Sequence, residues 1–265
     1  MNNHQEIHII NAFTDRPFGG NPAAICVVDR WPEEEWMQQV AAQNNLSETA
    51  FVLQSDRLAI RWFTPACEVD LCGHATLAAA FVLFGHYGYE HEVVFDSRSG
   101  PLGVAQKGDR LQMDFPADTP KPLTDPIDWA KALGTKPVET WRGKEDALIL
   151  LPNEAAVQNL APDLAEIARL PFRGVIVTAS DCAGEFVSRF FAPRFGILED
   201  PATGSAHTLL APFWANRQDR TTFTARQLSK RGAELYCTLS GDRVLIGGKA
   251  VVYLQGTIPA FGTNG

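Results

Sequence analysis

One pattern occurs twice in the chain, and it constrains the fold more than any other feature. In the first copy, residues 61–65 (RWFTP) lead through a short polar loop to Gly73 and an apolar stretch. In the second copy, residues 189–193 (RFFAP) lead in the same way to Gly204 and another apolar stretch. Self-similarity of this kind indicates a repeated structural unit. The sequence therefore predicts two similar halves, each a set of strands around one buried helix.

The other patterns predict an α+β protein with two β-rich domains. Apolar runs over 74–85 and 204–216 are too long for half-exposed strands and predict the two central helices, with a kink in the second possible at Pro212. Residues 116–126 (PADTPKPLTDP) have the composition of a linker. We expect domains at 1–117 and 118–265, with the last strand able to pack back on the first domain. Strands are expected at 6–13, 23–28, 49–53, 58–63, 93–96, 102–106, 110–115, 147–151, 175–178, 185–191, 234–239 and 250–254.

Composition and charge exclude several kinds of partner. The 265 residues are 45% hydrophobic, enough for a substantial core, and carry a formal charge of −8. A nucleic-acid or membrane partner is not expected, because both need a basic surface and no apolar run approaches the ~20 residues of a membrane span. A small anionic metabolite stays possible, since a cleft can be locally positive. The five cysteines are sparse and the N-terminus lacks signal-peptide features, so a cytoplasmic location is expected.

The starts of the two central helices form the expected binding site. A helix N-terminus presents unpaired N–H groups and about half a positive charge, so two of them in one cleft would bind a carboxylate. Gly73 and Gly204 would let a ligand approach the backbone closely. Either glycine alone is better explained by a tight turn into a buried helix. The matched pair favours binding.

Three polar residues near these helix starts are candidates for chemistry. Glu48 lies in residues 45–51 (NLSETAF), between a helix and an apolar strand. As an acid/base it would need enough shelter to raise its pKa, whereas an exposed or turn-capping role is the simpler alternative. Asp200 precedes the second helix, where an N-cap role is the alternative. His74 begins the first helix and would either bind substrate as a neutral ring or be a buried structural histidine.

Other chemistries lack their motifs. The chain has no GxGxxG, Walker A, GxSxG or HExxH sequence. Cys67 and Cys72 have no second cysteine pair, so no metal site is expected. Glu48 and Asp200 have the residue types of a glycosidase pair, but nothing supplies an aromatic sugar platform.

Five motifs occur in order along most of the chain: residues 11–14 (NAFT), 18–23 (FGGNPA), 45–51 (NLSETAF), 72–76 (CGHAT) and 199–206 (EDPATGSA). Together they resemble the PhzF-like family, named for the phenazine-biosynthesis isomerase, within the diaminopimelate epimerase-like superfamily. The resemblance implies two pseudo-symmetric domains, each a barrel-like sheet around a central helix. It also implies a homodimer that uses no cofactor.

The resemblance implies a role for particular residues. Glu48 corresponds to the catalytic acid/base, which in the phenazine enzyme shifts a proton between carbons of trans-2,3-dihydro-3-hydroxyanthranilate. The substrate-binding positions correspond to Gly73, His74, Asp200, Gly204 and Ser205, with Asn21 a weaker candidate. The implied activity is a cofactor-independent proton shift on a small carboxylate-bearing metabolite. A racemase or epimerase of an amino-acid-like substrate and a non-catalytic metabolite-binding protein remain as alternatives.

Two departures from the family pattern bear on this expectation. Related racemases use two cysteines, one before the glycine at each helix start. Here Cys72 occupies the first place and Thr203 the second, so a two-cysteine racemase is not expected. Asn11 stands where the family pattern has aspartate, which would alter local hydrogen bonding.

Overall fold

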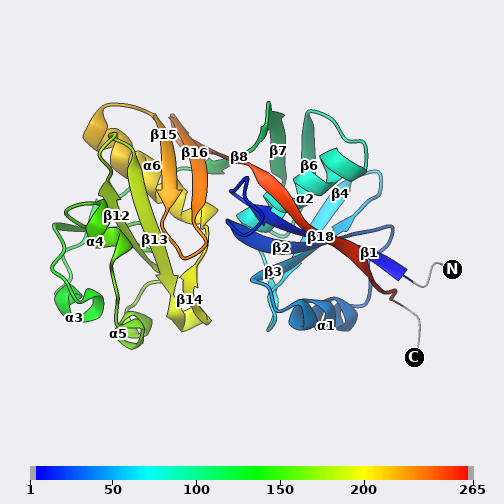
Figure 1. The fold of residues 1–265 in the computed structure, drawn as a ribbon, viewed down its shortest axis with the longest axis horizontal. Coiled ribbons are helices and arrows are strands. Elements are labelled where there is room, and N and C mark those ends of the chain that lie inside the picture. The colour runs from blue at the N-terminus through cyan, green and yellow to red at the C-terminus, as the bar shows by residue number, and fades with distance from the viewer. Residues whose placement is uncertain (1–3, 262–265) are drawn as a thin grey trace. The chain divides into compact units, whose positions relative to one another are not determined.

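The chain forms two compact units, shown in Figure 1. The computed structural model describes residues 4–261. The first unit combines Met1–Asp114 with Gly247–Gly265, and the second is Phe115–Ile246. The chain therefore divides after Asp114, not after residue 117 as expected, and its C-terminal segment belongs to the first unit.

The first unit is a sheet in which nearly every strand pairs with its neighbour in sequence. Its strands are β1 (His4–Ala12), β2 (Asn21–Val28), β3 (Glu48–Leu53), β4 (Leu58–Phe63), β5 (Glu68–Val69), β6 (Glu92–Asp96), β7 (Leu102–Lys107), β8 (Arg110–Pro116) and β18 (Ala250–Pro259). The order is β18-β1-β2-β3-β4-β6-β7-β8, with β5 as a short second partner of β4. The pairs β2–β3 and β4–β6 are parallel, and the others are antiparallel.

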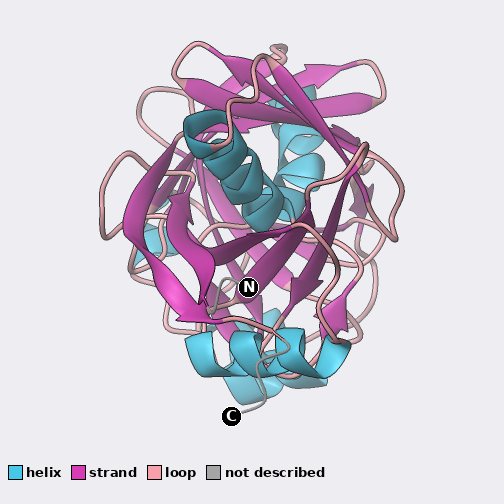
Figure 2. Cartoon of the chain, turned by 90° about the vertical axis from the view of Figure 1, so that its right-hand side faces the viewer, coloured by secondary structure: helices cyan, strands magenta, loops and turns pink. Residues whose placement is uncertain are grey.

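A single apolar helix forms the centre of this sheet. Helix α2 (Gly73–His86) packs against β1, β2, β3, β7 and β18, and most of its residues are buried. A helix that is apolar on all sides is stable only when enclosed; Figure 2 shows the strands around helical segments. Helix α1 (Glu34–Asn44) packs outside, on β3 and β4. No helix in the described part of the chain is long and apolar enough to cross a membrane.

The second unit repeats the strand pairings of the first. Its elements are β9 (Lys121–Pro122), α3 (Trp129–Leu133), β10 (Glu139–Arg142), β11 (Ala147–Leu150), α4 (Glu154–Gln158), α5 (Leu164–Arg169), β12 (Val175–Ser180), β13 (Phe186–Ala192), η1 (Pro193–Phe195), β14 (Ile197–Asp200), α6 (Gly204–Gln218), β15 (Thr222–Gln227), β16 (Ala233–Ser240) and β17 (Arg243–Gly248). The pair β11–β12 is parallel, β12–β13 and β13–β14 are antiparallel, and β13–β15 is parallel. The pairs formed by β2 to β6 have the same directions in the same order.

The repeat extends to side chains. In the first unit, Arg61 Nε lies 2.7 Å from Glu68 Oε1, joining β4 to β5. In the second, Arg189 Nε lies 2.7 Å from Glu199 Oε1, joining β13 to β14. These are the arginines of the two RWFTP-like motifs. The chain is thus an α+β fold of two similar halves, as the motif repeat predicted.

The second unit corrects the expectation of a linker and confirms that the second central helix spans Pro212. The expected linker contains the short strand β9, which pairs with β10 at two positions. So short a strand needs few N–H donors, so Pro122, which has none, is tolerated there. Helix α6 continues through Pro212. Proline has no N–H for the Thr208 carbonyl, and that carbonyl instead accepts from Asp118 N at 3.0 Å. The segment is therefore held against α6.

Candidate functional site

The start of β3 positions Glu48. Helix α1 ends at Asn45, which adopts the left-handed conformation (φ 50°) and turns the chain toward β3. Strands β2 and β3 are parallel, with Ala23 opposite Glu48, so both begin at the same edge of the sheet. Only 14% of the Glu48 side chain is exposed.

The first turn of α2 brings His74 to Glu48. His74 Nε2 lies 3.2 Å from Glu48 Oε2. Burial lowers the pKa of His74 to about 4, so the ring is neutral near pH 7. The ring also forms a hydrogen bond with the backbone of Pro22; proline has no N–H, so the ring must donate to its carbonyl oxygen.

Asn21 and Ser47 complete this cluster. Asn21 Nδ2 lies 3.4 Å from His74 Nδ1, and the Ser47 hydroxyl donates to Asn21 Oδ1 at 3.5 Å. The structure therefore brings together three predicted residues, Asn21, Glu48 and His74. Ser47 is an addition that the sequence argument did not single out, although it precedes Glu48 directly.

The loop between β1 and β2 fixes Asn21. Gly20 has φ +61°, and a Cβ on it would lie 2.1 Å from the Ala12 carbonyl oxygen, so only glycine can occupy the position. Asn11 Nδ2 donates to the Pro17 carbonyl at 2.7 Å. The aspartate expected at this position has no N–H to make that bond, so Asn11 contributes a loop contact that an aspartate could not.

At the start of α6, a buried glutamine orders Asp200 and Thr203. The Thr203 hydroxyl donates to Asp200 Oδ2 at 2.6 Å. Gln227 Nε2 donates to the Asp200 carbonyl at 2.8 Å, and its Oε1 accepts from Thr203 N at 2.8 Å. Gln227 is 1% exposed. Gln227 was not among the predicted site residues, because it lies on β15, a strand that the sequence patterns did not predict.

Ser205 is exposed in the first turn of α6 and contacts Arg173. The Arg173 guanidinium donates to Ser205 Oγ at 3.2 Å. It also forms a two-point pair with the Asp146 carboxylate. Burial raises the pKa of Asp146, with Arg173 opposing the shift. Neither residue was predicted, since both precede α6 by 30 residues or more and carry no motif of their own.

Both central helices start without a side-chain cap. The N-cap side chain of α2, Cys72, and that of α6, Thr203, make no capping hydrogen bond in the described structure. Instead each N-cap carbonyl accepts from a side chain one turn later: Thr76 Oγ1 at 2.6 Å in α2 and His207 Nδ1 at 2.8 Å in α6. The three short helices α3, α4 and α5 do have side-chain caps, from Asp128, Asn153 and Asp163. The positive ends of α2 and α6 are therefore not neutralised by their N-caps.

Glu48, Cys72 and His74 are also the residue types of a zinc site, and their ligand atoms lie within 4.8 Å of one another. However, Cys72 Sγ lies 3.5 Å from His74 Nδ1, whereas Glu48 lies beside Nε2. A zinc ion takes one ring nitrogen and holds its ligands roughly 3.5 Å apart. The set would have to rearrange to close around one ion, so the arrangement fits a metal poorly.

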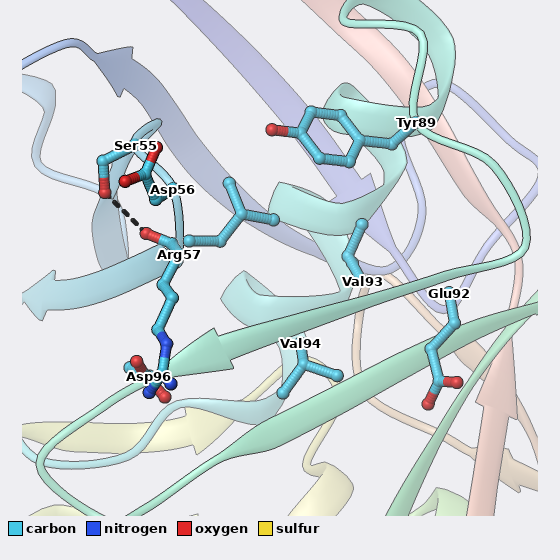
Figure 3. Close-up of a pocket in the computed structure, with 9 residues that line it drawn as sticks. Ser55, Asp56, Arg57, Tyr89, Glu92, Val93, Val94 and Asp96 are labelled. Carbon is cyan, nitrogen blue, oxygen red and sulfur yellow. Dashed lines mark hydrogen bonds between the residues drawn. The ribbon is translucent and has the colours of Figure 1, made fainter.

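A separate hollow of about 430 Å³ lies in the first unit (Figure 3). It is lined by residues that follow β3 and by β6, including Ser55, Arg57, Tyr89 and Asp96. Ser55 Oγ donates to the Arg57 carbonyl at 2.7 Å, which closes the turn at its rim. Glu48 begins β3, whereas the hollow lies beyond the other end of this strand. At 3.3 Å per residue, Glu48 and the hollow are about 20 Å apart. The hollow therefore belongs to a different part of the unit from the Glu48 cluster.

Comparisons with known proteins bear on the family and the fold of the chain. The family model described as phenazine biosynthesis-like protein matches residues 10–256. An uncharacterized isomerase of Pseudomonas aeruginosa is 50% identical, over 96% of this chain and 98% of its own length. A crystal structure of a PhzF-family protein from Enterococcus faecalis is 43% identical, with a TM-score of 0.94, over 97% of this chain and all of that one.

The same fold also occurs in proteins of much lower sequence identity. A hydroxyproline epimerase from Agrobacterium vitis shares the fold with a TM-score of 0.65 at 10% identity, over 99% of this chain and 94% of that one. The architecture is thus one that epimerases share. Within it, the chain belongs to the phenazine biosynthesis-like PhzC-PhzF family, which confirms the resemblance found in the sequence motifs.

Proposed function

We propose that this protein is an isomerase that shifts a proton along one face of a small, carboxylate-bearing metabolite. The observation that carries the proposal is the pairing of a largely buried Glu48 with a neutral His74 at the uncapped start of α2. The naming of its relatives as isomerases supports the same class of reaction.

Glu48 is the proposed acid/base. Its carboxylate removes a proton from one carbon, the electron pair moves along the unsaturated carbon chain, and the carboxylic acid returns the proton to another carbon. We assign the His74 ring proton to Nδ1, because Nε2 makes no hydrogen bond in the described structure and the ring donates to the Pro22 carbonyl. Asn21 Nδ2, itself a donor, is then a neighbour of Nδ1 and not its acceptor. The lone pair on Nε2 then accepts a hydrogen bond from Glu48 in its protonated form. His74 thus holds the loaded acid in position between the two proton transfers.

Substrate binding is assigned to the two helix starts. A carboxylate is stabilised by first-turn N–H groups that no N-cap side chain occupies, which assigns Gly73 and Gly204 to its binding. Ser205, Asp200 and Asn21 offer further hydrogen bonds. Thr203 and Gln227 act through Asp200 as positioning residues.

The reaction requires no redox step and no carrier of a chemical group, so we propose that it proceeds without a cofactor. We also propose that the protein acts as a homodimer. Size measurement in solution by light scattering tests the second point.

The function is tested by screening carboxylic acids for thermal stabilisation and then following each hit by proton NMR in deuterated water. The wild type should exchange a carbon-bound proton of its substrate for deuterium. Glu48→Gln keeps the shape of the side chain but cannot accept the proton. It should bind the same acid with similar affinity, while exchange falls by more than the ~10²–10⁴ of an assisting acid/base.

The matched control is Glu90→Gln, since the Glu90 side chain is 81% exposed and should leave exchange unchanged. A Glu48→Gln protein that exchanges at nearly the wild-type rate would remove Glu48 from the mechanism. Binding of an acid with no exchange by the wild type would instead support a metabolite-binding protein.

A further inference from the structure

The second unit contains a cavity of about 520 Å³ that the proposed reaction does not use. It lies between the β10–β11 turn, the segment before β12, and the β13–β14 connection. This volume is within the range that holds small organic ligands. Its lining is dominated by two kinds of side chain, cationic and aromatic.

Four cationic residues line the cavity: Arg142, Lys144, Arg173 and Arg194. The Arg142 guanidinium donates to the Gly143 carbonyl, and that of Arg194 donates to the Leu170 carbonyl. Both acceptors are uncharged, so these two positive charges remain available to a ligand. One acid, Glu145, also lines the cavity and lies 3.5 Å from Arg173, which is paired with Asp146 as well. The other three cations, Arg142, Lys144 and Arg194, leave the cavity positive although the chain as a whole carries −8.

Aromatic rings form the other walls. The Arg142 guanidinium lies 5.8 Å from the centre of the Phe172 ring, and that of Arg173 lies 5.5 Å from the Phe190 ring. Such stacking holds each guanidinium in a fixed plane. The Phe195 side chain, on η1, also lines the cavity and is 62% exposed. A ring left in solvent beside fixed positive charges offers a stacking surface to a flat ligand.

We infer that this cavity binds a small aromatic ligand that carries a phosphate group. Guanidinium groups suit phosphate because they donate two parallel hydrogen bonds to its oxygens, and Phe195 supplies a face for the ring. Phenyl phosphate and a nucleoside monophosphate share this chemistry. Arg173 also contacts Ser205, so a bound phosphate lies near the start of α6.

The test is calorimetric titration with phenyl phosphate and with AMP, using inorganic phosphate and adenosine as partial ligands. We expect at least one of these two aromatic phosphates to bind at least tenfold more tightly than either partial ligand. Tighter binding of AMP would show that the site prefers nucleotides, and equal binding would show that it accepts any small phosphate ester with an aromatic ring. Arg142→Ala and Arg194→Ala, both at exposed positions, should each weaken binding about tenfold.

Three comparisons make the result specific. Phe195→Ala should weaken the binding of phenyl phosphate and AMP but leave the binding of inorganic phosphate unchanged. Arg169→Ala removes an exposed arginine of the same unit outside the cavity and should change nothing. Glu48→Gln should bind the probes like the wild type, which separates this inference from the proposed isomerase. The inference is overturned if no saturable binding occurs at ligand concentrations of roughly 1–10 mM, where even weak small-ligand affinities of about 1 mM would be detected. It is also overturned if the cavity variants bind the aromatic phosphates as tightly as the wild type does.

Discussion

At the scale of single residues, the repeat explains why a thiol at position 72 need not be reactive. Cys72 is 7% exposed and lies against the neutral His74 ring. At the equivalent position of the second unit, the Thr203 hydroxyl is held by Asp200 and Gln227. A two-thiol mechanism therefore lacks its second member, and Cys72 has the surroundings of a structural cysteine.

We expect Cys72→Ser to keep most of the proton-exchange activity on whichever acid proves to be the substrate. The exchange rate and the melting temperature should both be measured. Complete loss of exchange with intact folding and binding would place a thiolate in the mechanism and favour an epimerase.

Gly20→Ala should destabilise the protein by several kcal/mol, roughly 1–3 for the left-handed backbone and more for the collision with the Ala12 carbonyl. It should also displace Asn21 from His74 and reduce exchange. Gly88→Ala is the matched control, because Gly88 has φ +72° but open space around it; it should cost only about 1 kcal/mol. Equal urea midpoints for the two variants would contradict the steric argument.

Local sequence was a reliable guide to some residues and misleading for others. Asn21, Glu48 and His74 were predicted from motifs, and the structure brings them together. Alternation along the first strand, with His8 between Ile7 and Ile9, predicts an outward-facing His8. That prediction is wrong, because His8 is fully buried. Alternation assumes that one face of the strand meets solvent, whereas β1 lies between β2 and β18 and the His8 ring packs 4.8 Å from that of His86 on α2.

At the scale of elements, the two central helices were predicted within two residues of their observed ends, because their apolar runs have no other stable placement. The expected linker was partly wrong. Strands β10, β14, β15 and β17 were among those missed. The residues of β10 (ETWR) and β15 (TFTARQ) are largely polar, β14 (ILED) has only four residues, and β17 ends in two glycines, so none has the apolar β-branched run that predicts a strand. The prediction that both helix starts serve one substrate stays a prediction.

Each central helix carries a buried histidine, and these should make stability depend on pH. Burial lowers the pKa of His74 and of His207 to about 4, below the 6.5 of an unfolded chain. The unfolded state therefore binds more protons between these values, so stability is complete above pH 6.5 and falls as the pH drops toward 4. At pH 5 the loss should be about 2 kcal/mol for each histidine.

Urea denaturation at pH 7.5 and pH 5 measures this loss. His207→Gln should reduce the difference between the two pH values, whereas His91→Gln should not, since the His91 side chain is 93% exposed. Equal stability at both pH values would show that the histidines are not buried in their neutral form.

At the scale of the whole molecule, the chain leaves the first unit after Asp114 and returns to it at Gly247. The returning strand, β18, pairs with β1 along the whole length of β1. The first unit thus depends on residues at both ends of the sequence, while the second is one continuous segment.

A chain that ends at Ile246 should therefore lose the first unit and keep the second. We expect it to fail to bind the substrate acid. Limited proteolysis should release a resistant fragment close to Phe115–Ile246 while the preceding residues are digested. A truncated protein with wild-type resistance throughout would show that β18 is dispensable.

The pairing of β1 with β18 also sets the order of events on the ribosome. His4–Ala12 leaves the exit tunnel well before its partner Ala250–Pro259 is synthesised, with roughly 10–50 s between them at typical elongation rates. Until then β1 has an open edge of the kind that invites aggregation, and the unit that holds Glu48 is incomplete. Chains terminated before residue 250 should therefore be inactive and readily degraded, because the proposed acid/base site forms only after β18 has been translated.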